Sequence, residues 1–208
     1  MSERSSPTSL FDTIAARIDA SPEALRSLGF TGAVTGEGAS TVALGTAAAL
    51  GDVQSGPVLI IDANWIDHTV TDGAGARDAP GLAACLRGTI QAKAAVIPTA
   101  HRNVSLLPAG VENDRPPLGE LPSVFASLGR DFRYVVVDLP PVLTATALVI
   151  SWSVVLARLF LVVRADSGRA SLVQNALSAL APVTTPALIL NAADARARRP
   201  AARAYVAR

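Results

Sequence analysis

Residues 29–41 read GFTGAVTGEGAST, a short apolar run that leads into a glycine-rich turn and then into small residues compatible with a helix. Glycines in such a turn let backbone N–H groups point inward, and the N-terminus of the following helix adds a dipole that favours negative charge. A hydroxyl from Ser40 or Thr41 is suited to Mg²⁺. The stretch therefore predicts a strand over 29–34, a helix from about 40, and between them a phosphate-binding loop made by Gly36, Glu37, Gly38, Ala39, Ser40 and Thr41.

Further short apolar runs, each typical of a strand buried on both faces, follow at 57–62, 104–109, 134–139, 159–164 and 185–190. Segments of helical composition alternate with them, at 40–53, 121–132, 144–157 and 169–181. Strands that alternate with helices imply right-handed crossovers and a mostly parallel sheet. The predicted fold class is α/β, a doubly wound, mostly parallel sheet with helices on both faces.

One stretch has the length of a membrane span. Leu139–Ala157 carries no charged residue over 19 positions. Two prolines stand at its start, charged residues bound it on both sides, and strand-like runs precede and follow it. A buried strand–helix–strand unit is the favoured interpretation.

The composition is that of a globular protein in a reducing compartment. Half of the 208 residues are hydrophobic, 17% are charged and the net charge is +1, so neither disorder nor a nucleic-acid partner is expected. The single cysteine, Cys85, excludes an internal disulfide framework. Three regions are predicted: an N-terminal tail and helix over 1–20, one α/β domain over 21–193, and an arginine-rich tail over 194–208.

Polar side chains stand where predicted strands end. Asp62 ends the second strand and Asp138 the fourth, and ligands of open α/β sheets bind beyond these carboxyl ends. Together with Ser40, these two carboxylates are candidate Mg²⁺ ligands. A strand-end aspartate is more often a cap or a turn former, so the order of the segments carries the prediction.

The segments resemble, in their order, those of bacterial tyrosine kinases, the cytoplasmic P-loop partners of polysaccharide co-polymerases in capsule and exopolysaccharide export. The resemblance covers about residues 21–191. It rests on GEGAST (36–41), VLIIDA (58–63), GLAACLRG (81–88), NVSLLPAG (103–110), RYVVVDLPPVL (133–143), LFLVVR (159–164) and LILN (188–191).

The resemblance implies a P-loop NTPase-like domain that binds ATP or ADP with Mg²⁺. It implies Walker A, Walker A′ and Walker B segments at the loop, at Asp62 and at Asp138, and phosphorylation of tyrosines in a C-terminal tail. Related P-loop ATPases use an Asn at the end of the last strand to contact adenine, which makes Asn191 a cofactor-binding candidate. A turn-forming role for Asn191 is an equal alternative.

The departures from the family pattern point to lost catalysis. Ala39 takes the place of the P-loop lysine, which sets a positive charge beside the β- and γ-phosphates. Asn64 replaces the second Walker A′ acid, and Thr146 stands near the place of an expected aspartate. Tyr205 is all that remains of the tyrosine cluster, and Lys93 is the only lysine of the chain.

These features predict a pseudokinase that binds ATP or ADP with Mg²⁺ weakly or not at all. By resemblance it partners the cytoplasmic ends of a membrane polysaccharide co-polymerase, lies at the inner membrane as a peripheral cytoplasmic protein, and self-associates. One alternative is an active ATPase or tyrosine autokinase in which an arginine from a neighbouring subunit replaces the lysine. A weaker one is a positioning protein of the ParA/MinD type.

Overall fold

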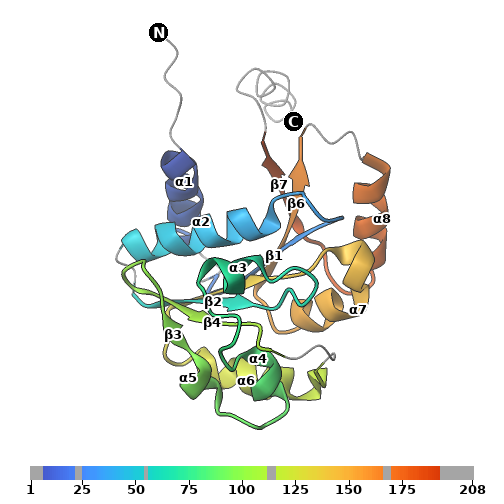
Figure 1. Cartoon of the computed structure of the whole chain (residues 1–208). Coiled ribbons are helices and arrows are strands. Elements are labelled where there is room, and N and C mark those ends of the chain that lie inside the picture. Colours follow the sequence, from blue (N-terminus) through green and yellow to red (C-terminus); the bar gives the residue numbers. More distant parts are fainter. Residues whose placement is uncertain (1–6, 22–24, 54–55, 112–115, 166–169, 193–208) are drawn as a thin grey trace.

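The computed structural model describes residues 7–21, 25–53, 56–111, 116–165 and 170–192. Within these ranges the strands form a seven-stranded sheet in the order β3-β4-β2-β5-β1-β6-β7 (Figure 1). Every neighbouring pair is parallel except β3 and β4, which confirms the predicted α/β class with a mostly parallel sheet. The strands are β1 (Ser27–Gly32), β2 (Val58–Asp62), β3 (Ile97–Pro98), β4 (Val104–Leu107), β5 (Tyr134–Asp138), β6 (Arg158–Arg164) and β7 (Ala187–Asn191).

Helices cover both faces of the sheet, as a doubly wound fold requires. The helices are α1 (Pro7–Asp19), α2 (Ala39–Asp52), α3 (Thr69–Gly73), α4 (Leu82–Leu86), α5 (Ala92–Ala95), the 3₁₀ helix η1 (Leu118–Glu120), α6 (Leu121–Leu128), α7 (Val142–Ser153) and α8 (Ala170–Leu180). Residues of α1 and α2 share one hydrophobic cluster with the sheet, and residues of α4 to α8 share the other.

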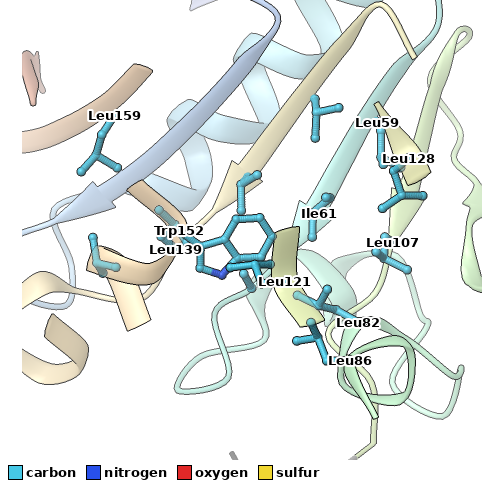
Figure 2. Packing of buried hydrophobic residues seen from close by; sticks show 14 of the residues in the cluster. Leu59, Ile61, Leu82, Leu86, Leu107, Leu121, Leu128, Leu139, Trp152 and Leu159 are labelled. Atoms are coloured by element: carbon cyan, nitrogen blue, oxygen red, sulfur yellow. The ribbon is translucent and has the colours of Figure 1, made fainter. Parts of the chain in front are cut away.

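Strand β5 shows why its sequence is apolar throughout. Val135 and Val137 belong to the cluster on the α7 side, whereas Tyr134 and Val136 belong to the cluster on the α2 side. Since side chains alternate along a strand, only an unbroken apolar run satisfies a sheet covered on both faces. Figure 2 shows the first cluster, in which the fully buried Trp152 lies among leucines from several elements.

The boundaries differ from the predicted ones in a few places. The first strand runs over 27–32 rather than 29–34, because the chain leaves the sheet at Ala33 to form the loop. The short antiparallel strand β3, of two residues, and the helices α3, α4 and α5, of four or five residues, were not predicted, since such short segments carry little periodicity. Helix α1 lies within the predicted N-terminal tail and helix over 1–20, begins at Pro7, and buries Ala15 and Ile18 against α2.

The membrane-length stretch folds as predicted for a buried unit. Its middle forms α7, whose Val149 and Trp152 are fully buried. Among the described residues no helix has both the length and the apolar character needed to cross a bilayer. The tail over 194–208, with Tyr205, lies outside the described residues.

Candidate nucleotide-binding site

The phosphate loop lies between β1 and α2, as the sequence predicts. Gly36 and Gly38 have φ angles of 89° and 87°, a left-handed conformation that favours glycine at both positions. Helix α2 begins at Ala39, and no described side chain caps its first turn. Its leading N–H groups are therefore available to an anion, as the first N–H groups of a helix have no partner within it.

The loop lines a small open pocket of about 160 Å³. The pocket is flanked on the β2 side by Asn64, Asp67 and Thr69 and on the β5 side by Leu139 and Pro141. None of the described residues that line it is a lysine or an arginine, and Asp67 adds a carboxylate. Its glycine turn before a helix is the kind of backbone that binds phosphate in other proteins, while the described lining side chains supply no positive charge.

Asp138 stands at the end of β5 with its carboxylate completely buried. Neither oxygen has a hydrogen-bond partner among the described residues. Burial raises the pKa of Asp138 from 3.8 to about 8, and the negative charges of Asp62 and Asp67 act in the same direction. The nearby Ser40 hydroxyl lowers this pKa somewhat, although its geometry falls short of a hydrogen bond.

The surroundings of Asp138 fit a divalent cation. A buried carboxylate without a partner is costly unless a cation or hydrogen bonds compensate it. Ser40 and Asp138 would hold Mg²⁺ through oxygen atoms, the ligands that this ion prefers. Bound Mg²⁺ would supply positive charge for phosphate oxygens at the loop.

Asp62 is the register neighbour of Asp138 on the adjacent strand β2 and is equally buried. One carboxylate oxygen accepts the Asn64 N–H at 3.0 Å. The other accepts the Thr71 N–H at 2.9 Å and the Thr71 hydroxyl at 2.7 Å. Burial raises the pKa of Asp62, and the bonds from Thr71 lower it. Asp62 therefore ties the segment that follows β2 to the sheet.

Asn64 lines the pocket, but its side chain also shapes the chain. Its Oδ1 accepts the N–H groups of Ile66 at 3.3 Å and Asp67 at 3.2 Å. Trp65, next in sequence, donates its Nε1–H to the Ala109 carbonyl at 3.1 Å and packs against the core. Trp65 is therefore a packing residue of this segment.

Asn191 ends β7 and reaches the phosphate loop. Its Nδ2 donates to the carbonyl oxygen of Glu37 at 2.9 Å, and its Oδ1 accepts the Ala192 N–H at 2.9 Å. Glu37, predicted as part of the phosphate-binding loop, accepts the N–H of Arg164 at 2.5 Å through Oε2 of its side chain. The sequence predicted that the strand-end residues lie at the carboxyl edge of the sheet, but it did not predict these hydrogen bonds to Glu37.

Two residues of the site were missed by sequence reasoning. The Thr71 hydroxyl donates to Asp62 and accepts the Ala109 N–H at 3.0 Å. Asp67 lines the pocket. Both follow Asp62 within ten residues, and no pattern in the sequence distinguishes them from other loop residues. Thr146, which stands near the place of an aspartate in the family pattern, donates its hydroxyl to the Val142 carbonyl at 2.7 Å within α7.

No family model and no curated protein matches the chain. Among solved structures, the kinase domain of VpsO aligns with a TM-score of 0.79 and 21% identity over 90% of this chain and 95% of that domain. The kinase domain of the Escherichia coli tyrosine kinase ETK aligns with a TM-score of 0.73 and 18% identity, over 88% of this chain and 74% of the other.

A third neighbour was solved with a nucleotide analogue. Cobyrinic acid a,c-diamide synthase from Mycobacterium smegmatis, with a bound ATP analogue and magnesium, aligns with a TM-score of 0.64 and 20% identity over 87% of this chain and 83% of that one. At these identities the likeness concerns architecture. The chain has the P-loop NTPase-like α/β fold of the VpsO and ETK kinase domains.

Proposed function

We propose that this protein is a degenerate relative of the bacterial tyrosine kinases, a pseudokinase that retains a weak site for ATP or ADP with Mg²⁺. One observation carries the proposal: the glycine loop and an Asp138 without a hydrogen-bond partner among the described residues are present, whereas no described residue lining the pocket carries a positive charge. Loop amides and a cation at Asp138 support binding. Without the lysine, the charge that develops on the transferred phosphoryl group is not stabilised.

Calorimetric titration with Mg·ATP and Mg·ADP tests this proposal. We expect dissociation constants in the high micromolar range or weaker and hydrolysis near background. Ala39→Lys restores the charge and is expected to tighten Mg·ATP binding at least about tenfold, about 1.4 kcal/mol. Ala39→Met, of similar length but uncharged, is the matched control. A turnover of about 1 s⁻¹ or more in the parent protein would contradict the proposal.

The cellular role proposed by resemblance is to partner a membrane polysaccharide co-polymerase from the cytoplasmic side of the inner membrane, in exopolysaccharide synthesis and export. Deleting the gene is then expected to lower or alter extracellular polysaccharide, and complementation with Ala39→Lys to restore it as well as the parent gene does. Normal polysaccharide amount and chain length in the deletion strain, with no co-purifying membrane protein, would leave this role without support.

An active ATPase or autokinase is the second candidate. The acidic residues at the pocket favour it, because they would attract a cation from a neighbouring subunit. Asp67 lines the pocket and its charge acts on Asp138, so the negative charge there would attract an arginine from a neighbouring subunit. Such an enzyme is expected to show specific activity that rises with protein concentration, because the cation arrives with the partner. A ParA/MinD-type positioning protein is weaker still, since Thr35 and Ala39 occupy the two places where such proteins need lysines.

A further inference from the structure

Glu37, in the middle of the phosphate loop, joins the loop to the ends of two strands. Glu37 is 2% exposed. Its carboxylate accepts the Arg164 N–H at 2.5 Å, while its carbonyl oxygen accepts the Asn191 amide N–H at 2.9 Å. Arg164 and Asn191 are register neighbours on β6 and β7. Both bonds therefore run from one loop residue to the same corner of the sheet.

The adjacent glycines show how closely these groups approach the loop. A Cβ atom on Gly38 would lie 2.2 Å from the Asn191 Nδ2, and one on Gly32 would lie 3.0 Å from the Glu37 Cβ. Gly38 thus has two reasons to be glycine, its positive φ and the amide beside it. The side chains of Asn191 and Glu37 thus fill the space that a side chain at position 38 or 32 would occupy.

We propose that Glu37 and Asn191 are positioning residues that hold the phosphate loop in its binding shape before any ligand arrives. The two hydrogen bonds, Glu37 to Arg164 and Asn191 to Glu37, are called the loop latch below. Asn191 acts on the loop backbone, with both ends of its amide already engaged in the protein. The proposal rests on the proposed function only in treating the loop as a phosphate cradle.

The physical need for a latch follows from the loop's composition. Glycine loses more conformational freedom on ordering than any other residue, and this loop contains two glycines in the left-handed region. A loop that must order on binding lowers apparent affinity in proportion to the fraction of molecules that already have the binding shape. With Ala39 in place of lysine, the backbone donors carry a larger share of phosphate binding, so their order counts for more.

Backbone ¹⁵N relaxation of the full chain without nucleotide tests the latch directly. In Asn191→Ala and in Glu37→Ala we expect the order parameters of Gly36 and Gly38 to fall from about 0.85 to below about 0.6. Asn103→Ala is the matched control, since the Asn103 amide makes the same kind of bond to the Gly51 carbonyl, at 3.2 Å, away from the loop. It should leave both order parameters unchanged.

Glu37→Gln keeps the proposal testable if an alanine variant fails to fold. Its side-chain carbonyl can accept the same Arg164 N–H, so the loop should stay ordered. Order parameters in the alanine variants equal to those of Asn103→Ala, or a loop as loose in Glu37→Gln as in Glu37→Ala, would overturn the proposal.

Titration with Mg·ADP separates this inference from the proposed function. If the parent protein binds, Asn191→Ala is expected to bind about tenfold more weakly, and Asn103→Ala within about twofold of the parent. A parent protein that binds no nucleotide, combined with a loop that loosens only in the latch variants, would remove the proposed function and leave the latch intact. Unchanged affinity in Asn191→Ala would contradict the positioning role.

Discussion

Asp62 and Asp138 are register neighbours at the ends of β2 and β5, and both are completely buried. Asp62 accepts three hydrogen bonds from the segment that follows its strand, whereas Asp138 accepts none from the described residues. The same residue type with the same burial therefore does two jobs. Asp62 anchors the chain, whereas the carboxylate of Asp138 has no hydrogen-bond partner among the described residues.

Removing the anchor should have the largest effect. Asp62→Ala leaves the Asn64 N–H and both Thr71 donors without their acceptor in a buried place, and leaving buried donors unsatisfied costs about 1–3 kcal/mol for each. We expect the free energy of unfolding to fall by about 3–5 kcal/mol, measured by urea denaturation at pH 7. A decrease in the free energy of unfolding of less than about 1 kcal/mol would show that Asp62 does not anchor the chain.

Asp138→Asn should raise the free energy of unfolding at high pH rather than lower it. In the folded protein Asp138 has a pKa of about 8, against 3.8 for an ordinary aspartate, so the folded state binds the proton more tightly than the unfolded state. Its contribution to stability is greatest below about pH 4 and declines as the pH rises to about 8, by up to about 1.4 kcal/mol per pH unit. Asp62, whose pKa is also raised, contributes with the same sign.

The measurement is urea denaturation across pH 5 to 8. We expect the parent protein to lose stability with rising pH and Asp138→Asn to flatten this dependence and to be the more stable at pH 8, because the amide is never ionised. A steeper dependence in the variant, or a parent protein more stable at pH 8 than at pH 5, would contradict the raised pKa of Asp138.

Thr71→Val tests the anchor from its other end, with an expected loss of about 1–3 kcal/mol. Valine keeps the shape but removes the hydroxyl that donates to Asp62 and accepts the Ala109 N–H. Thr69→Val is the control, since its hydroxyl bonds Asp67 at an exposed position, and it should cost less than about 0.5 kcal/mol. Equal losses in the two variants would show that the Asp62 network adds nothing specific.

The smallest expected effect is stabilisation by Mg²⁺ alone. A cation that binds the ionised Asp138 of the folded state only should raise the melting temperature at pH 8, by about 1–3 °C at 10 mM Mg²⁺ for millimolar affinity. Asp138→Asn should lose the shift and Asp67→Asn should keep most of it, as measured by differential scanning calorimetry. An equal shift in Asp138→Asn would place the ion elsewhere.

The class of fold was predictable because it depends on patterns that each segment carries by itself. YVVVD must be apolar throughout to be buried on both faces, and the glycines of 36–38 can occupy the left-handed region whatever surrounds them. The same local reasoning placed Asp62, Asp138 and Asn191 at the carboxyl edge. It could not see β3 or α3 to α5, which are too short for periodicity.

Which polar group bonds which was decided by the tertiary structure. The sequence by itself determined the strand–loop–helix unit, the absence of a lysine at position 39 and the strand ends that converge on one edge. It did not determine that Thr71 satisfies Asp62, that Asp138 finds no partner within the part of the chain that the structure describes, or that Asn191 reaches Glu37 across 154 positions. Hydrogen bonds act over about 3 Å, so partners distant in sequence are set only when packing brings their strands together.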